Sequence, residues 1–159
     1  MADTSAAAGP ELRPLPPDDL ERIIAIDRLR TGRARRRFFE RRLAAARLSP
    51  DDFVHVGLVR GGELRGYAMA RLQRGEFGQP HLVAVFDAIG VHEVGLGQAL
   101  MGGLVKMLGA RGVDVLQSQA DWTNHALLRF LEATGFELAS RLVLERSVSE
   151  PLPETVDNA

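Results

Sequence analysis

The chain of 159 residues contains no cysteine, which excludes disulfide bridges, a thiol nucleophile and a cysteine-ligated metal site. It has no run close to the roughly 20 apolar residues that span a membrane. Its first ten residues also lack the apolar stretch of a secretory signal. With a formal net charge of −1, it has no basic excess of the kind typical of dedicated nucleic-acid-binding proteins. We therefore expect a cytoplasmic protein that binds neither membranes nor nucleic acid.

The four histidines are the remaining candidates for metal ligation, and their spacing matches no common set of metal ligands. They are His55, His81, His92 and His125. We expect no metal site.

The hydrophobic content of 45% is enough for a buried core, and the length favours one domain. We expect this domain to span residues 11–148. A leader over residues 1–10 and a tail over residues 149–159 are predicted to be flexible.

The most informative stretch runs from residue 81 to residue 111. Residues 81–91 are apolar on both faces, which predicts a central strand covered on both sides. Apolar residues then recur at three- and four-residue steps, which predicts a helix with one buried stripe. This stripe contains Leu96, Leu100, Leu104, Met107 and Leu108. The helix begins at Gly95 and Gly97, and free N–H groups at such a bare helix start are typical of phosphate sites.

Turn residues and hydrophobic periodicity divide the rest of the chain into further strands and helices. Further strands are expected over residues 11–15, 53–60, 63–73, 113–121 and 142–146. Further helices are expected after residues 16–19, around residues 35–43 and after residues 123–124. The pattern predicts a mixed α/β sheet without an internal repeat.

Asn124 is followed at a distance by Gly135 and Phe136, and the glycine turn comes after a buried strand. In these features, and in the order of its elements, the chain resembles GNAT-type N-acetyltransferases over roughly residues 11–148. The resemblance implies a mixed, mostly antiparallel sheet of roughly six to seven strands, flanked by about four helices. It also implies that the fourth and fifth strands splay apart.

The resemblance implies acetyl-CoA as cosubstrate. His92, Gly95 and Gly97 match the family's pyrophosphate motif, R/Q-x-x-G-x-G/A, with His92 in place of Arg or Gln. The turn is shorter than the usual one by about four residues, which leaves fewer backbone donors for a pyrophosphate. The residues implied to bind the cosubstrate are Ile89, Gly90, Val91, His92, Gly95, Leu96, Gly97, Gln98 and Asn124. Leu131 replaces the usual tyrosine acid, and the only tyrosine, Tyr67, lies on another strand.

Three residues are candidates for acid–base chemistry. Asp87 lies in an apolar strand, where burial raises a carboxylate pKa toward a value useful for a base; alternatively, it accepts hydrogen bonds from an arginine or a loop. Asp121 ends a row with Gln117 and Gln119 that either lines a wet cleft or forms an internal network. His125 is either a general acid or a surface neighbour of a helix cap.

The predicted function is transfer of an acetyl group from acetyl-CoA directly to a primary amine of a small molecule or peptide. The alternative is a non-catalytic acyl-CoA-binding or regulatory module, and a homodimer is left open for either. Arginines between Arg33 and Arg42 surround Phe38 and Phe39. They either select an acceptor with a carboxylate or phosphate group or form a solvated helix face.

Overall fold

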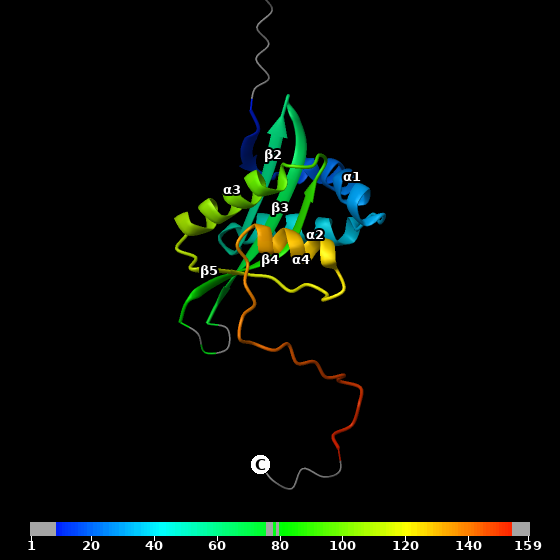
Figure 1. Ribbon diagram of the computed structural model, residues 1–159, viewed down its shortest axis with the longest axis vertical. Helices are drawn as coiled ribbons and strands as arrows, with labels where there is room; N and C mark the ends of the chain where they lie inside the picture. Colours follow the sequence, from blue (N-terminus) through cyan, green and yellow to red (C-terminus); the bar gives the residue numbers. More distant parts are fainter. Residues whose placement is uncertain (1–8, 76–77, 79, 154–159) are drawn as a thin grey trace, which may run out of the picture.

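The computed structural model describes residues 9–75, 78 and 80–153. Of the predicted flexible ends, residues 1–8 and 154–159 lie outside the described residues. A five-stranded sheet of order β1-β2-β3-β4-β5 forms the centre of the molecule (Figure 1). Its strands are β1 (Glu11–Pro14), β2 (Phe53–Arg60), β3 (Glu63–Arg74), β4 (Leu82–Val91) and β5 (Val115–Gln117). All neighbouring strands are antiparallel except β4 and β5, which are parallel.

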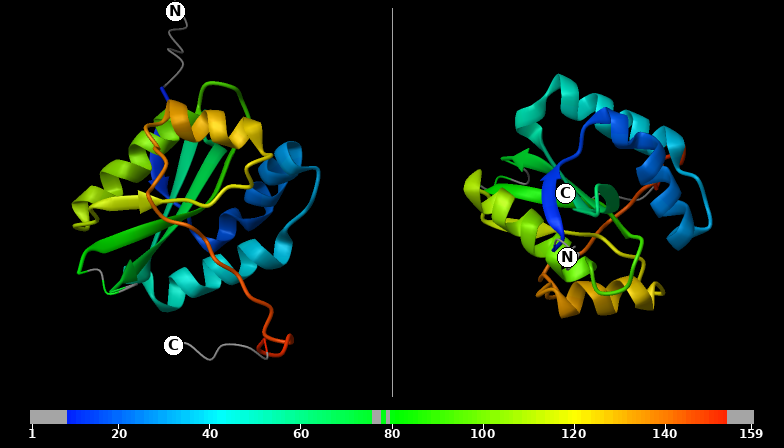
Figure 2. Two further views of the ribbon diagram at one scale, coloured as in Figure 1. Left: turned by 60° about the horizontal axis from the view of Figure 1, so that its bottom comes forward. Right: turned by 90° about the horizontal axis from the view of Figure 1, so that it is seen from above.

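Two layers of helices cover the sheet, one on each face (Figure 2). The helices are α1 (Leu20–Thr31), α2 (Arg36–Leu48), α3 (Gly97–Ala110) and α4 (His125–Ala133), with short 3₁₀ turns at Pro17–Asp19 and Pro50–Asp52. Helices α1 and α2 pack on one face, and α3 and α4 pack on the other. None of the helices within the described residues is long and apolar enough to cross a membrane.

Alternating side chains of the central strands form two separate cores. Val54, Val56 and Leu58 of β2 point toward α3 and α4. Tyr67 and Met69 of β3 point the other way, toward α1 and α2. Since successive side chains of a strand lie on opposite faces, one continuous apolar strand supplies both cores. This explains why the central strands are apolar on both faces.

The pairing of β3 with β4 contains a bulge at Asp87. Met69 lies opposite Ala88, whereas Ala70 lies opposite Phe86, so Asp87 has no partner of its own in β3. A bulge of this kind redirects a side chain and increases the local twist. It places Asp87 on the face that is covered by α2, where it contacts Arg42 of that helix.

The mixed fold and the helix layers agree with the sequence predictions, but the number of strands is lower than predicted. The described residues form five strands instead of six to seven, and β5 has three residues instead of nine. Residues 142–146, predicted to be the last strand, form none. The alternating pattern shows only that one side of this segment is apolar, and a strand also needs a neighbouring strand to pair with.

Candidate functional site

A gap opens between β4 and β5 toward the carboxyl end of β4. The two strands pair only at Val83–Val85 and Val115–Gln117. Residues 86–91 of β4, apart from the bulged Asp87, pair with β3 on one side, and they have no strand among the described residues on the other side. The predicted splay between the fourth and fifth strands is therefore confirmed.

The backbone of β4 presents free groups to this gap. The N–H of His92 donates to the carbonyl of Arg65 at 2.7 Å. Hydrogen-bonded pairs alternate along an antiparallel ladder, so Gly90 is also bonded to β3, opposite Tyr67. The N–H and C=O groups of Ile89 and Val91 then point away from β3, into the gap. These two residues are the ones that can pair with an amide-containing ligand.

Gly90 itself is required for packing. A Cβ atom at this position would lie 2.5 Å from Cε1 of Tyr67, which is closer than real carbon atoms approach. Gly90 therefore has a structural role, which is to leave room for the buried ring of Tyr67. Its contact with the cosubstrate stays a prediction.

The elbow, which we define as residues His92 to Leu96, connects β4 to α3. Gly95 has φ +93°, a conformation that favours glycine, and no atom lies within 4 Å of the place where its Cβ would be. Within the described part of the chain, the N–H groups of Gly97, Gln98 and Ala99 have no acceptor. No acidic side chain occupies the first turn of α3. The elbow therefore offers open space and aligned backbone donors, which is the arrangement that binds phosphate groups.

Neighbouring contacts fix the two ends of the elbow. Leu96 is buried in the core, and a Cβ at Gly97 would lie 2.8 Å from Cε2 of Phe130 in α4. On the other side, Glu93 pairs with Arg60 at 3.2 Å and with Arg65 at 3.6 Å. Gly97 thus holds α3 close to α4, in addition to its predicted role as a phosphate donor.

Two of the other predicted residues lie at the start of α4. Asn124 caps this helix, and its Oδ1 accepts a hydrogen bond from the N–H of Leu127 at 3.2 Å. His125 is the first residue of the helix and is exposed. His92, in the elbow, lies with its Nδ1 3.4 Å from a guanidinium nitrogen of Arg65.

Asp121 is exposed and makes only local contacts. Its Oδ1 accepts hydrogen bonds from the N–H of Thr123 at 3.0 Å and from the Thr123 hydroxyl at 2.8 Å. These bonds, led by the one from the backbone, lower the pKa of Asp121 below its ordinary value. A lowered pKa is the opposite of what a general base needs. Gln119 and Asp121 also lie beyond the end of β5, so the predicted polar row does not continue along the strand.

Asp87 lies between two arginines. Its Oδ1 accepts from Nε of Arg71 at 3.2 Å, and its Oδ2 forms an ion pair of 3.1 Å with Nε of Arg42 that is not aligned as a hydrogen bond. The side chain of Asp87 is 6% exposed. The arginine contacts match the alternative prediction for this residue.

His55 lies close to this group and is also buried. Burial, and then the positive charge of Arg42, lower the pKa of His55 to about 4. Within the described residues, neither ring nitrogen has a hydrogen-bond partner. His55 is therefore a packed, neutral side chain at neutral pH, which agrees with its predicted position on a strand.

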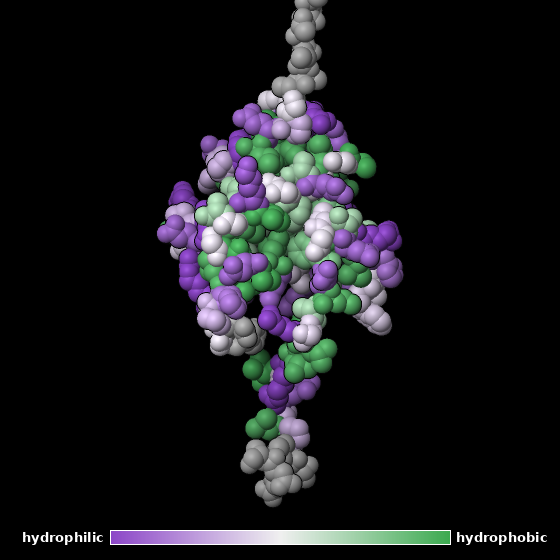
Figure 3. All heavy atoms as spheres, turned by 60° about the vertical axis from the view of Figure 1, so that its left-hand side comes forward, coloured by the Kyte–Doolittle hydropathy of each residue, from purple (hydrophilic) through white to green (hydrophobic). Residues whose placement is uncertain are grey.

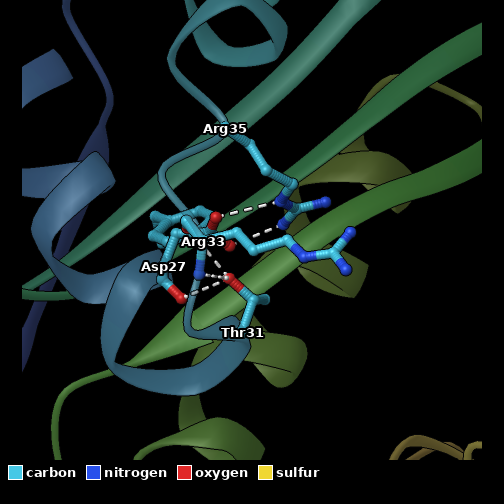
Figure 4. A network of polar contacts seen from close by, with 5 residues as sticks. Asp27, Thr31, Arg33 and Arg35 are labelled. Atoms are coloured by element: carbon cyan, nitrogen blue, oxygen red, sulfur yellow. Dashed lines mark hydrogen bonds and ion pairs between the residues drawn. The ribbon is translucent and has the colours of Figure 1, made fainter.

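Sequence reasoning missed a second buried polar group, formed by Asp27, Arg35 and Tyr67. Asp27 is 1% exposed and accepts hydrogen bonds from Arg35 Nε at 2.9 Å, from Arg35 Nη2 at 2.5 Å and from the Tyr67 hydroxyl at 2.9 Å. Figure 4 shows Arg35 reaching from the start of α2 to Asp27 in α1, while the Thr31 hydroxyl donates to the backbone carbonyl of Asp27. The only signal in the sequence is that Asp27 lies on the apolar side of its helix, next to Ile26.

Tyr67 cannot replace the missing tyrosine acid in this position. Burial, followed by the charge of Asp27, raises the pKa of Tyr67 far above its ordinary value. Its hydroxyl proton is committed to Asp27. Leu131, which the resemblance aligns with the family's tyrosine, is buried in the core together with residues of α3, and its side chain carries no acidic group.

One further hollow lies at the opposite end of the sheet from the elbow. It is an open groove of about 630 Å³ between the end of α2 and the adjoining ends of β2 and β3. Arg71, which contacts Asp87, is one of its lining residues. No three His, Asp or Glu side chains of the described residues gather closely enough to hold a metal ion.

Comparison with models of protein families finds no match, and comparison with curated proteins finds no relative. Solved structures do match. A transcriptional regulator from Bacillus halodurans C-125 is 19% identical, with 87% of this chain and 99% of that one covered and a TM-score of 0.68. An aminoglycoside N-acetyltransferase in complex with CoA is 17% identical, with 87% and 95% covered and a TM-score of 0.68.

A third match is glucosamine-6-phosphate N-acetyltransferase from Arabidopsis thaliana, which is 17% identical, with 87% and 99% covered and a TM-score of 0.62. At such low identity these likenesses establish the fold alone. The chain has the GNAT fold of N-acetyltransferases, and the resemblance predicted from the sequence is confirmed at that level.

Proposed function

We propose that the chain is an acyl-CoA-dependent N-acetyltransferase that moves an acetyl group from acetyl-CoA directly to a primary amine. The observation that carries the proposal is the presence of two sets of free backbone groups, one before and one after the elbow. The first set belongs to Ile89 and Val91 in the gap, and the second to Gly97, Gln98 and Ala99 at the start of α3. A molecule with two amides followed by a pyrophosphate matches these two sets.

The residues present fit this cosubstrate. Ile89 and Val91 would pair with the amides of its arm, and the elbow and the first turn of α3 would hold the pyrophosphate through Gly95, Leu96, Gly97 and Gln98. The bound cosubstrate supplies an activated thioester. His92 and Asn124 stay proposed contacts, although Asn124 Oδ1 is already used in capping α4.

The part of the protein in the transfer is to polarise the thioester carbonyl and to take a proton from the amine. A backbone N–H in the stretch from Ile89 to Val91 would face the carbonyl oxygen, as oxyanion donors do. We propose Asp87 as the base, because it is the carboxylate at the bulge of β4. Asp121 and His125 are weaker candidates, since both are exposed at or before the start of α4. The C–N bond would form as the C–S bond breaks, CoA would leave as its thiolate, and the amine proton would pass to Asp87 directly or through water.

We propose a small-molecule amine as acceptor. An aminoglycoside acetyltransferase with the same fold has been solved in complex with sisomicin; it is 13% identical, with a TM-score of 0.66. The basic surface of α2 is smaller than its sequence predicts, because acids compensate several of its arginines. Arg35 pairs with Asp27, Arg36 with Glu21, and Arg42 with Asp87. This compensation supports the interpretation of α2 as largely a solvated helix face.

The test uses a pair of matched glycine substitutions at the two ends of α3. Gly95→Asp places a negative charge at the proposed pyrophosphate site, and Gly112→Asp places one at the far end. Both glycines have positive φ, of +93° and +77°, and open space around a Cβ, so the backbone strain is similar. We expect Gly95→Asp to abolish CoA binding in isothermal titration and Gly112→Asp to leave it within about threefold of the original chain.

Equal affinities for the two variants would contradict the phosphate site. A second assay measures thiol release from acetyl-CoA over a panel of amines. CoA binding without thiol release for any amine would favour the alternative, a non-catalytic acyl-CoA-binding module. Two observations support keeping that alternative: both oxygens of Asp87 are engaged by arginines, and a buried leucine stands in place of the tyrosine acid.

A further inference from the structure

Arg42, Arg71 and Asp87 form a group under α2 that carries more positive than negative charge. On the face of the molecule in Figure 3, hydrophilic residues lie scattered around a central apolar area. In the group under α2, by contrast, two guanidinium groups share one carboxylate, which leaves one excess positive charge. Among the described residues, neither arginine pairs with a second carboxylate. Because the group is largely buried, this excess charge favours an anion beside it.

The two arginines differ in how many of their nitrogen atoms contact Asp87. Arg42 approaches the carboxylate with Nε at 3.1 Å and Nη2 at 3.4 Å, and its guanidinium lies over the ring of Phe38, 5.4 Å from the centroid. Arg71 donates only from Nε, at 3.2 Å. Its two terminal nitrogens donate no hydrogen bond to any residue that the structure describes. A guanidinium with such free nitrogens binds a carboxylate or a phosphate strongly.

The open groove of about 630 Å³ at the end of α2 lies against Arg71. Its walls include Leu48, which is 82% exposed, and Phe53. Arg74 also lines the groove, but its charge is compensated by Asp52 at 2.8 Å. The groove therefore combines apolar walls with one arginine that has donors to spare. This combination suits a small molecule that has an apolar part and an anionic group.

We propose that the groove binds the anionic group of the amine acceptor, so that the acceptors are primary amines that also carry a carboxylate or a phosphate. This substrate class rests on the proposed acetyl transfer with Asp87 as base. Arg71 connects the two places, because it contacts Asp87 through Nε and also lines the groove. An acceptor whose anionic group binds Arg71 is thereby held beside the proposed base, and its negative charge compensates the excess positive charge of the group.

The first experiment tests the anion site without any acetyl transfer. Hexanoate has an apolar part and a carboxylate but no amine, and it is titrated into the isotope-labelled chain and followed by NMR. The Nε–H signal of Arg71 and the methyl signals of Leu48 should shift with a common dissociation constant. Hexylamine, which carries the opposite charge, should leave both signals unchanged.

A matched pair of leucine substitutions tests whether the groove is the site. Leu48→Glu places a negative charge in its wall and should weaken hexanoate binding at least about fivefold. The control is Leu29→Glu, the same change at a 67% exposed leucine of α1 outside the groove, which should keep the affinity within about twofold. Arg71→Gln should abolish binding. Because that variant also removes a partner of Asp87, the leucine pair decides the result if it does not fold.

The second experiment measures acetyl transfer to amines with and without an anionic group. The series runs from β-alanine to 6-aminohexanoate, each compared with the alkylamine of equal length, and it includes phosphoethanolamine compared with ethanolamine. For the best anionic amine, kcat/KM should be about 10- to 100-fold higher than for its uncharged-end counterpart. Leu48→Glu should lose most of this preference through a higher KM, and Leu29→Glu should keep it.

The two experiments separate this substrate class from the proposed function. Acetyl transfer without a preference for anionic amines would overturn the substrate class and leave the transferase standing. Hexanoate binding in the groove without transfer to any amine would overturn the proposed function, and its acceptor class with it. If hexanoate shifts neither signal, or if Leu48→Glu and Leu29→Glu bind it equally well, the groove is not the anion site and the proposal is wrong.

Discussion

The carboxyl half of β4 separates two regions that handle charge in different ways. On one side, the gap and the elbow present backbone groups, from Ile89 to Ala99, which follow one another in the sequence. On the other side, under α1 and α2, charge is held by side chains from distant elements: Asp27 bonds to Tyr67, and Asp87 to Arg42. The first region needs glycine so that its backbone groups stay accessible, whereas in the second region each charge depends on a particular partner side chain.

This difference predicts how the two regions respond to substitution. Substitutions under α1 and α2 should mainly alter stability, because they leave buried charges without their partners or expose them to solvent. Changes at the elbow should mainly alter ligand binding, because the backbone donors there are already open to solvent. Asp87 connects the two regions, since it lies on β4 and is held by arginines of α2 and β3.

The largest effect is therefore expected for Asp87→Asn. Loss of a general base lowers kcat by about 10²- to 10⁴-fold, and the pH dependence of kcat should change with it. The matched control is Asp52→Asn, which removes a carboxylate from an exposed pair with Arg74 and should keep kcat unchanged. Steady-state kinetics with the best amine of the panel measures both variants. An Asp87→Asn protein that folds and keeps the original kcat would exclude the proposed base.

Asp27→Ala should be the most destabilising change. It leaves the Arg35 guanidinium and the Tyr67 hydroxyl without their shared buried acceptor. Removal of one partner from such a group costs about 3–5 kcal/mol of unfolding free energy. Urea unfolding measures the loss, with exposed Asp51→Ala expected within about 0.5 kcal/mol of the original chain. A small effect at Asp27 would mean that the network contributes little to the fold.

His55 should make stability depend on pH. Its pKa is lowered to about 4 in the folded chain, whereas an unfolded histidine has a pKa of about 6.5. The unfolded chain therefore binds the proton first as pH falls, so the stabilisation is complete above about pH 6.5 and is lost as pH decreases toward 4. The expected loss is about 3 kcal/mol.

This pH effect is isolated by comparing the original chain with His55→Leu. Urea unfolding at pH 7.5 and pH 4.5 gives the change for each protein. The variant should lose less unfolding free energy between pH 7.5 and pH 4.5 than the original chain, because it lacks the part due to His55 and keeps only the part due to the carboxylates. Identical pH dependence in both proteins would show that His55 takes up a proton in the folded chain as readily as in the unfolded one.

Tyr67→Phe should have the smallest effect of this series. It removes one hydrogen bond to a buried carboxylate, which contributes about 1.5–3 kcal/mol, and it keeps the ring that packs against Gly90. CoA affinity and kcat should stay as in the original chain, because the hydroxyl faces Asp27 and not the gap. A large decrease in kcat at unchanged stability would instead give Tyr67 a catalytic role.

How well each region could be predicted depends on how far apart its interacting residues lie in the sequence. The strand, turn and helix around Gly95 are contiguous, so periodicity and glycine placement predicted all three elements; the phosphate site at their junction stays a prediction. Asp27 and Tyr67 are 40 residues apart, and Arg42 and Asp87 are 45 apart. No local pattern identifies such partners, and the bulge that turns Asp87 toward Arg42 has no signature in its own sequence.

The segment after α4 shows the opposite error, because here the sequence predicted a strand that the structure does not contain. Residues 142–146 were predicted to form a strand from their alternation, and this prediction is wrong for the described chain, which provides no neighbouring strand for them. The alternation indicates which side chains of a segment can be buried, but it does not indicate which strand or surface would cover them.

The central claim is that backbone groups along β4 and the elbow bind the cosubstrate. Mapping amide chemical shifts of the isotope-labelled chain by NMR during titration with CoA tests it most directly. The account predicts the largest shifts at Ile89, Val91, Gly95, Gly97 and Gln98, with amides near Asp27 and Arg35 nearly unchanged. Shifts that cluster under α1 and α2, or no shifts at millimolar CoA, would contradict it.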